Sequence, residues 1–182
     1  MIVLASSSES RARILHDAGV VFEQIACDFD EEQIIATSPK NFVYQATLGK
    51  YEACKKHLGL ERPLLVADTV VTSGGEILRK AKDVDDARRI LKLQSGSVTA
   101  IVTCMIYASK DFFFLDMAST EYLFDDFSAE ALEVYLESGA WRGKAGACMV
   151  EGFCKPYIKS VKGLESNAMG LGIETLLPFI DV

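Results

Sequence analysis

Residues 64–71 read LLVADTVV, an apolar run rich in β-branched residues that predicts a buried strand. Asp68 interrupts this run, and apolar residues continue on both sides of it. A carboxylate in a buried strand costs free energy unless it is paired or bound to a metal ion. Asp68 is therefore a candidate functional residue, and the alternative is that it caps a loop where the strand ends.

The N-terminal stretch MIVLASSSESRARIL predicts a second buried strand over 2–5 and a helix over 9–18. Three serines, Ser6 to Ser8, lie where the strand gives way to the helix. Serine is a good helix cap, which is one explanation for them. The other explanation is an anion site, because the first N–H groups of a helix lack partners and the helix dipole favours negative charge there.

The rest of the chain alternates between helical and extended patterns. Ser38 as a cap and Pro39 in the first turn predict a helix that runs to about Leu58. The other expected segments are helices over 84–95 and 128–139, strands over 99–109, 111–117 and 119–124, and extended stretches over 147–151 and 156–161. Hairpin strands combined with crossover helices predict an α/β fold, a mixed sheet flanked by helices. The length of 182 residues fits one domain, 1–182.

Charge and composition limit the possible partners. The formal net charge is −7, which argues against a nucleic-acid scaffold because such proteins carry a basic excess. A polyanionic ligand would need a local basic cluster or a metal ion. The sequence shows no signal peptide and no apolar run long enough to cross a membrane, so we expect a cytoplasmic protein.

The cysteines are odd in number and form no CxxC pair. We interpret them as small buried hydrophobic residues in a reducing compartment. They are Cys27, Cys54, Cys104, Cys148 and Cys154.

Two basic residues stand in positions that are unusual for a surface cation. Lys50 shares an apolar helix stripe with Val43 and Ala46, so it either reaches out to solvent or faces a cleft. Arg11 lies in a first helical turn, where a cation opposes the helix dipole unless an anion binds nearby. The alternative for Arg11 is a surface ion pair with Glu9 or another acid.

Two charged segments add further candidates. The segment GGEILRKAKD over 74–83 contains Lys80, which is either a phosphate ligand or part of a solvated charge run. The segment CDFDEE over 27–32 contains Glu31 and three more acids. Carboxylates of this kind can hold Mg²⁺, and the alternative is an ordinary polar loop.

Together these residues are suited to a single ligand. The serine loop, Arg11, Lys50 and Lys80 suit a polyphosphate, while Glu31 and Asp68 suit the metal ion that neutralises it. The sequence has no GxxxxGK[ST] motif, so it is not a P-loop enzyme, and no GxGxxG follows the first strand.

The same residues carry a resemblance to a known family. LASSSESRARIL resembles the opening motif of the Maf family, LAS-x-S-P followed by an arginine and paired leucines. The order continues through FDEE, the Lys50 helix, ADTVV, GEILRKAKD, Ser95-Gly96, KAGACMVEGF and the late segment Asn167-Ala168-Met169-Gly170-Leu171. The chain is similar to Maf proteins over nearly its whole length.

The resemblance implies a fold like that of inosine triphosphate pyrophosphatase (a Maf/Ham1 fold), with a cleft between two lobes, and a homodimer. Maf proteins are nucleoside triphosphate pyrophosphatases that cut between the α- and β-phosphates and need a divalent metal cation, Mg²⁺ or Mn²⁺. The positions that match the family's active site are Ser8, Arg11, Glu31, Lys50, Asp68 and Lys80, with Asp68 as the proton acceptor. We expect phosphate contacts from Ser6, Ser8, Arg11, Lys50 and Lys80, and metal contacts from Glu31, Asp68 and Glu151.

The chain departs from the family pattern at several positions. These are Glu9 for a proline, Gln45 for an arginine, Arg79 and Ala81 for a glycine and a proline beside Lys80, Thr99 for a histidine, Glu151 for a glutamine and Gly172 for a proline. Glu151 has the largest consequence, because a carboxylate cannot donate a hydrogen bond as an amide does and repels phosphate unless it is protonated or metal-bound.

Two functions follow from this sequence. The first is an enzyme that hydrolyses nucleoside triphosphates, ordinary or modified. The second is a nucleotide-binding regulatory protein of cell division or septum formation with little turnover, which Gln45 and Glu151 slightly favour.

Overall fold

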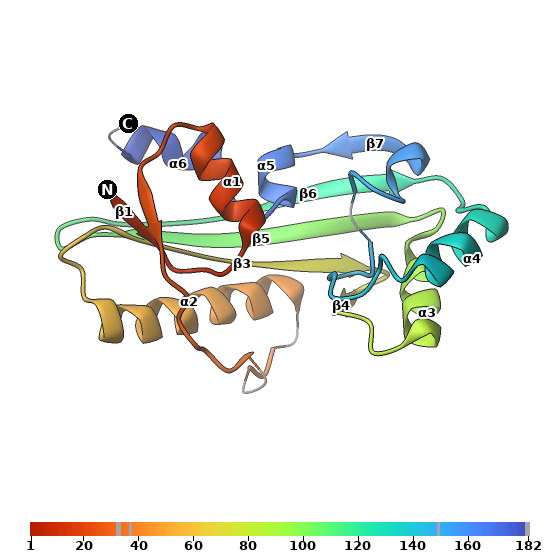
Figure 1. Cartoon of the computed structure of the whole chain (residues 1–182), viewed down its shortest axis with the longest axis horizontal. Coiled ribbons are helices and arrows are strands. Elements are labelled where there is room, and N and C mark those ends of the chain that lie inside the picture. The colour runs from red at the N-terminus through yellow and green to blue at the C-terminus, as the bar shows by residue number, and fades with distance from the viewer. Residues whose placement is uncertain (32–33, 37, 149, 181–182) are drawn as a thin grey trace. The chain divides into compact units, whose positions relative to one another are not determined.

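The computed structural model describes residues 1–31, 34–36, 38–148 and 150–180. Strands in this part of the chain form a seven-stranded sheet in the order β2-β1-β3-β5-β6-β7, with β4 paired to β3 (Figure 1). The strands are β1 (Ile2–Leu4), β2 (Phe22–Gln24), β3 (Leu64–Ser73), β4 (Glu76–Leu78), β5 (Val98–Ala108), β6 (Phe113–Phe124) and β7 (Ile158–Lys162). The helices are α1 (Glu9–Asp17), α2 (Pro39–Leu58), α3 (Val84–Gln94), α4 (Ala129–Ser138), α5 (Glu165–Ala168) and α6 (Ile173–Leu176).

The sheet is mixed. β1 runs parallel to both β2 and β3, whereas β3 is antiparallel to β4 and β6 is antiparallel to β7. Helices connect the parallel strands, and this confirms the predicted α/β fold with a mixed sheet flanked by helices.

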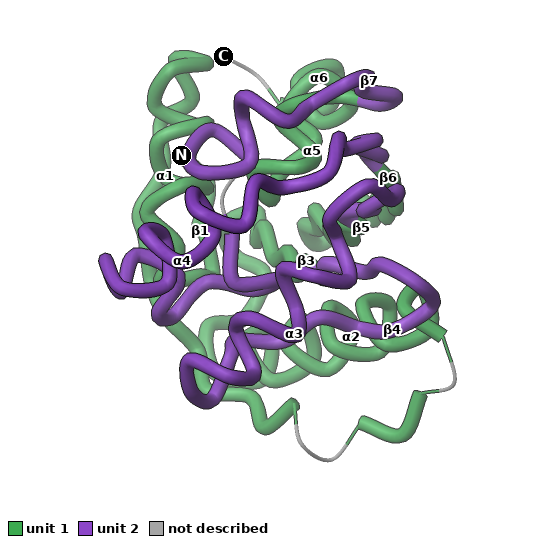
Figure 2. Tube along the Cα trace, turned by 90° about the vertical axis from the view of Figure 1, so that its right-hand side faces the viewer, with its two compact units in different colours: residues 1–69, 102–119, 164–182 green, residues 70–101, 120–163 purple. Residues whose placement is uncertain are grey.

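The chain divides into two compact units, which Figure 2 shows in different colours. Unit 1 comprises residues 1–69, 102–119 and 164–182, and unit 2 comprises residues 70–101 and 120–163. Three strands, β3, β5 and β6, contribute residues to both units. None of the helices in the described ranges is both long and apolar enough to cross a membrane.

Unit 1 has a hydrophobic core on each face of its strands. Alternate residues of β1 separate between them: Ile2 and Leu4 join one core, and Val3 joins the other. The first core lies under α1 and α6 and the second under α2, so the strands are covered by helices on both faces (Figure 1). Burial on both faces explains why β1 and the start of β3 are almost entirely apolar in the sequence.

Unit 2 packs α3 beside α4, and charged side chains link the two helices. Arg88 of α3 donates to both carboxylate oxygens of Glu133 on α4, at 3.1 and 2.8 Å. Aromatic rings fill the space near α4, where the Tyr135 and Phe153 rings stack with centroids 4.4 Å apart.

The predicted helices agree closely with the structure, including their caps. Ser8 and Ser38 each accept a hydrogen bond from a backbone N–H of the first turn, as expected of N-cap serines. The strands expected over 111–117 and 119–124 form the single strand β6, since no glycine or proline interrupts this stretch.

The extended segment expected over 147–151 is wrong for its described residues, which do not include residue 149. Gly146 and Ala147 have φ angles of 67° and 52°, and residues in this left-handed region form a turn rather than a strand. The segment expected over 156–161 begins as a 3₁₀ turn at Lys155–Tyr157 and becomes extended only in β7.

The expectation that all the cysteines are separate buried thiols is also wrong. Disulfides join Cys27 to Cys54 and Cys148 to Cys154, with Cα–Cα distances of 5.7 and 6.6 Å. Cys104 is free and buried, as predicted. Sequence spacing does not reveal pairs that lie on different elements, because connectivity depends on the fold.

The unit 1 core makes a testable contribution to stability. Leu4 is fully buried beneath α1, so we expect Leu4→Ala to lower the free energy of unfolding by about 3 kcal/mol. Urea denaturation of the full chain measures this change. The matched control is Val21→Ala, which changes an exposed side chain in the same unit and should shift stability by less than about 0.5 kcal/mol. Equal losses in both variants would contradict the core assignment.

Candidate active site

The pleat of β3 sends two adjacent polar residues to opposite faces of unit 1. Leu64 and Val66 belong to the core under α2, while Leu65 and Ala67 belong to the core under α1 and α6. Continuing this alternation directs Asp68 toward α2 and Thr69 toward α1.

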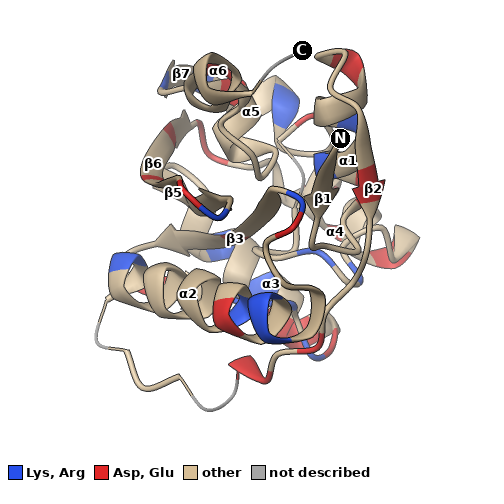
Figure 3. Cartoon of the chain, turned by 90° about the vertical axis from the view of Figure 1, so that its left-hand side faces the viewer, with Lys and Arg blue, Asp and Glu red and all other residues tan. Residues whose placement is uncertain are grey.

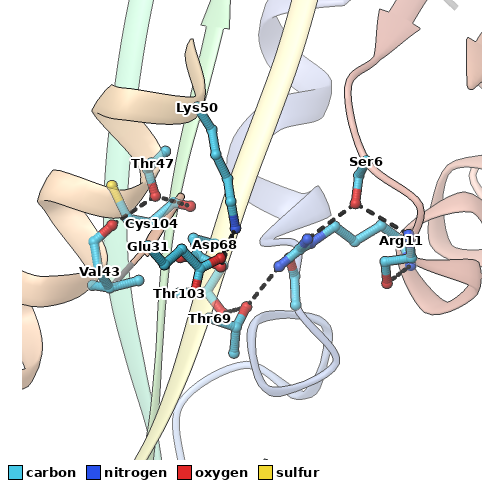
Figure 4. A network of polar contacts seen from close by, with 12 residues as sticks. Ser6, Arg11, Glu31, Val43, Thr47, Lys50, Asp68, Thr69, Thr103 and Cys104 are labelled. Atoms are coloured by element: carbon cyan, nitrogen blue, oxygen red, sulfur yellow. Dashed lines mark hydrogen bonds and ion pairs between the residues drawn. The ribbon is translucent and has the colours of Figure 1, made fainter. Parts of the chain in front are cut away.

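Partners reach these two residues from opposite faces at the same point of the strand. The pairing of β1 with β3 ends at the Leu4–Leu65 pair, three residues before Asp68. Figure 4 shows the Lys50 side chain approaching from α2 and the Arg11 side chain approaching from α1. Beyond the end of β1, the Lys50 and Arg11 side chains therefore reach neighbouring residues of β3 from its two faces.

On the α2 side, Lys50 holds two carboxylates together. Its Nζ lies 3.0 Å from Oδ1 of Asp68 and also contacts Oε1 of Glu31 (Figure 4). α2 carries basic and acidic residues along its length (Figure 3), yet Lys50 faces this acidic pair. The Lys50 side chain therefore does not extend into solvent, which was one of the two positions expected from the sequence, but points toward Glu31 and Asp68.

Asp68 is strongly buried, with 7% of its surface exposed, and its environment favours the protonated form. Burial raises the pKa of Asp68, and the nearby Glu31 charge raises it further, while the Lys50 charge and hydrogen bond oppose the rise. Oδ2 of Asp68 is buried and has no hydrogen-bond partner among the described residues. An orphaned carboxylate oxygen with a raised pKa is suited to accept a proton or to bind a cation.

On the α1 side, Arg11 is fixed by groups from three parts of the chain. Its Nε donates to the carbonyl oxygen of Gly170 at 2.8 Å, and its two Nη atoms donate to Oγ of Ser6 and Oγ1 of Thr69, each at 3.1 Å. Burial lowers the pKa of Arg11, while the charges of Asp68 and Glu31 raise it. The surface ion pair with Glu9 that the sequence left open is not the arrangement seen.

Two serines of the Ser6–Ser8 loop make different contacts with Arg11. Ser8 caps α1 through a hydrogen bond from the Arg11 backbone N–H at 3.4 Å, while the Ser6 hydroxyl orients the Arg11 side chain. The Gln24 amide of β2 donates to the carbonyl oxygens of Ser6 and Ser8, at 2.7 and 3.3 Å. The first turn of α1 and the Arg11 guanidinium are therefore held beside one another, which is a favourable arrangement for an anion.

A chain of hydroxyl groups supports Arg11, and the sequence prediction did not include it. Oγ1 of Thr103 on β5 donates to the carbonyl oxygen of Asn167 at 2.7 Å and lies 2.9 Å from Oγ1 of Thr69. Because the Thr103 proton is used for Asn167, Thr69 donates to Thr103 and accepts from Arg11. The only signal in the sequence was the hydroxyl residue directly after Asp68.

Gly170 is required where the late segment approaches Arg11. Its φ angle is 107°, a conformation that residues with a side chain rarely adopt. A Cβ atom there would also lie 3.4 Å from Nε of Arg11 and 3.4 Å from Oγ1 of Thr69. The glycine in the late motif thus allows the backbone to contact the site directly.

The donor set of unit 1 fits a hard divalent cation. Glu31 and Asp68 provide carboxylate oxygens around one point, and the orphaned Oδ2 of Asp68 is available. In the described part of the chain, no group of three or more His, Cys, Asp and Glu side chains is gathered as a metal site. Mg²⁺ is commonly bound through one or two carboxylates together with water and substrate phosphates.

The remaining candidates belong to unit 2. Lys80 is exposed and forms an isolated β-bridge with Ala145, and Glu151 is exposed in a turn. Their expected roles as phosphate and metal ligands stay predictions. Glu32, the last acid of the 27–32 segment, lies outside the described residues.

Known proteins are similar to this chain over nearly its whole length. The family model described as Maf-like protein matches residues 1–181. A protein of a Nitratiruptor species named nucleoside triphosphate pyrophosphatase is 54% identical over 178 residues, which cover 97% of this chain and 96% of that protein. A protein of the same name from Helicobacter pylori (strain Shi470) is 40% identical over 176 residues, covering 97% and 93% of the two chains.

Among solved structures, the Staphylococcus aureus Ham1 protein aligns with a TM-score of 0.46 and 15% identity. The alignment covers 69% of this chain and 72% of that one. The family match over nearly the whole chain confirms the resemblance found in the sequence motifs.

The charge balance at Asp68 can be tested by removing Lys50. Because the Lys50 ammonium lowers the pKa of Asp68, we expect Lys50→Met to raise that pKa further. A carboxyl ¹³C NMR titration of the full chain measures it. Lys56→Met is the matched control, since Lys56 is an exposed lysine in the last turn of the same helix. An unchanged Asp68 pKa in the Lys50 variant would contradict the pairing.

Proposed function

The chain belongs to the Maf-like protein family, and on this premise we propose that it is a nucleoside triphosphate pyrophosphatase. It hydrolyses ribonucleoside or deoxyribonucleoside triphosphates, ordinary or modified, to the nucleoside monophosphate and pyrophosphate. The observation that most supports this proposal is the buried Asp68 carboxylate, paired with Lys50 and carrying one unpartnered oxygen, at the point that Arg11 also reaches.

In the proposed mechanism the basic groups bind the triphosphate. Arg11 and Lys50 contact phosphate oxygens beside the Ser6–Ser8 loop, where the first N–H groups of α1 favour an anion. Lys80 of unit 2 supplies a further cation. These contacts accelerate the reaction where they favour the charge that develops in the transition state as pyrophosphate leaves.

Asp68 acts as the proton acceptor in this mechanism. Water attacks the α-phosphorus, and the Asp68 carboxylate takes its proton while the bond to the β-phosphate oxygen breaks. In the metal-free protein, burial raises the pKa of Asp68, which favours proton transfer to this carboxylate.

A divalent cation, Mg²⁺ or Mn²⁺, is the cofactor that these residues would hold. Glu31 and Asp68 would be its protein ligands, and Glu151 is a further candidate. Such an ion would lower the pKa of a coordinated water and offset phosphate charge. The Lys50 ammonium lies against both carboxylates and would contact phosphate beside them.

Proposals on the domain, oligomeric state and location of the protein rest on the family to which it belongs. We propose that residues 1–182 act as one Maf-like domain and that the chain is a cytoplasmic homodimer with no nucleic-acid partner. The match of the family model to residues 1–181 supports the single domain.

The second candidate function, a nucleotide-binding regulator of septum formation, rests on Gln45 and Glu151. A panel of ordinary and modified triphosphates, assayed for pyrophosphate release with Mg²⁺, with Mn²⁺ and with a chelator, separates the two functions. We expect metal-dependent release of equal amounts of pyrophosphate and nucleoside monophosphate, and loss of both with the chelator. Tight nucleotide binding without products would instead support the regulator.

The role of Asp68 can be tested by Asp68→Asn. An amide cannot accept the proton, so we expect pyrophosphate release to fall by about 100-fold or more. Because the folded pKa of Asp68 is raised, its ionised form costs stability, and this cost grows as the pH rises through that pKa. The melting temperature of Asp68→Asn at neutral pH should therefore equal or exceed that of the wild type.

The matched control is Asp28→Asn, which changes an exposed acid of the neighbouring loop and should leave pyrophosphate release unchanged. Full activity in the Asp68 variant, or a large loss of its thermal stability, would contradict the assigned role.

A further inference from the structure

Alternate residues of the acidic loop contact α2. Cys27 is bonded to Cys54, the ring of Phe29 lies over Gly49, and Glu31 pairs with Lys50. The intervening residues Asp28 and Asp30 are exposed. The loop therefore lies along the helix as an extended segment with one face turned toward it.

The contact of Phe29 with the helix is very close. A Cβ atom added to Gly49 would lie 2.2 Å from Cζ of Phe29, so the ring occupies the place of a side chain on α2. Without the disulfide, Ile25 and Cys27 still pack against the core under α2. The contacts of the following residues include the Phe29 ring contact and the ion pair of Glu31, whose side chain is 40% exposed, and an ion pair this exposed is weak.

The disulfide is accessible from one side. Cys54 is 1% exposed, whereas Cys27 is half-buried and lines a cavity of about 270 Å³. The other residues lining this cavity are Ala26, Asp28, Ala53 and His57. An incoming thiolate can therefore approach the Cys27 sulfur through the cavity, while the Cys54 sulfur is shielded.

We propose that Cys27–Cys54 is a reversible thiol–disulfide exchange site for dithiol reductants, and that its state sets how firmly Glu31 is held beside Lys50 and Asp68. This proposal adds a modification site to the proposed function, and its effect on catalysis rests on that function.

The exchange is balanced in two steps. A thiolate of the dithiol attacks Sγ of Cys27, the S–S bond breaks, and the Cys54 thiolate leaves and takes a proton. The second thiolate of the reductant then attacks the mixed disulfide and releases the Cys27 thiolate, which is also protonated. The protein gains two electrons and two protons, and the dithiol becomes a disulfide. A disulfide oxidant reverses the reaction.

Reduction loosens the acidic loop because it removes a covalent tether. The cross-link joins residues 27 positions apart in sequence, and Lys50 lies one helical turn before Cys54. The bond thus fixes the start of the loop close to the helix position that Glu31 must reach. In the reduced protein Glu31 leaves Lys50 more often, which weakens a metal site that uses its carboxylate.

The first test needs no catalytic activity. The full chain is prepared oxidised with a disulfide oxidant or reduced with dithiothreitol, and thiol labelling with peptide mapping identifies the bonded pairs. Hydrogen exchange of the peptides that cover 25–31 should be at least about fivefold faster in the reduced protein. A factor of about five is the lower limit of the coupling commonly found between two linked sites. No Cys27–Cys54 bond in the oxidised protein, or equal exchange in the two states, would overturn the proposal.

Variants assign the effect to this pair. Cys27→Ser with Cys54→Ser should exchange like the reduced wild type in both conditions, whereas Cys148→Ser with Cys154→Ser should keep the full redox response. Gly49→Ala displaces the Phe29 ring and should speed exchange of the loop even in oxidised protein. A redox response that follows Cys148 and Cys154 would refute the assignment.

The effect of the disulfide on metal binding is measured in a separate experiment. Free Mn²⁺, followed by electron paramagnetic resonance during titration, should show about fivefold weaker binding to the reduced protein, and the Mg²⁺ needed for half-maximal pyrophosphate release should rise by a similar factor. A protein that releases no pyrophosphate in either state refutes the proposed function, while the exchange and labelling results still decide the proposal about the disulfide.

Discussion

The alternation of side chains along β3 is the constraint on which the site depends. Two consecutive residues, Asp68 and Thr69, must face opposite sides of the strand, and each needs its own partner. The Lys50 ammonium meets the first and the Arg11 guanidinium the second. The pairing of β1 with β3 ends three residues before Asp68, so β1 does not separate the two faces of β3 at Asp68 and Thr69. The Asp68 carboxylate and the Arg11 guanidinium therefore influence each other's pKa.

This arrangement is what the proposed binding of a polyanion by a chain with a net charge of −7 would depend on. Arg11 and Lys50 are each held by acceptors that are buried or half-buried. Ser6, Thr69 and Gly170 fix one guanidinium in position, so little ordering remains to be done when phosphate arrives. The acids Glu31 and Asp68 hold Lys50 in place, and they are the ligands proposed for a metal ion.

The sequence predicted the regular parts of this structure because local rules determine them. α1, α2 and β3 could be located from serines at helix N-termini, glycines after helix C-termini and apolar runs. The interruption of the β3 run at Asp68 identified the central carboxylate. The supporting hydroxyl of Thr103 could not be found in this way, since its partners come from distant segments. The Cys27–Cys54 bond and the left-handed turn at Ala147 escaped for the same reason. Both depend on which segments the fold brings together.

The contact between Arg11 and the Gly170 carbonyl has a consequence for synthesis on the ribosome. The arginine is translated before its carbonyl acceptor, which follows it by 159 positions. A nascent chain therefore carries an Arg11 side chain that lacks this partner until the glycine has been translated. Premature termination before this glycine would yield a product that contains the sequences of β1 to β7 but lacks the acceptor for the Arg11 Nε atom.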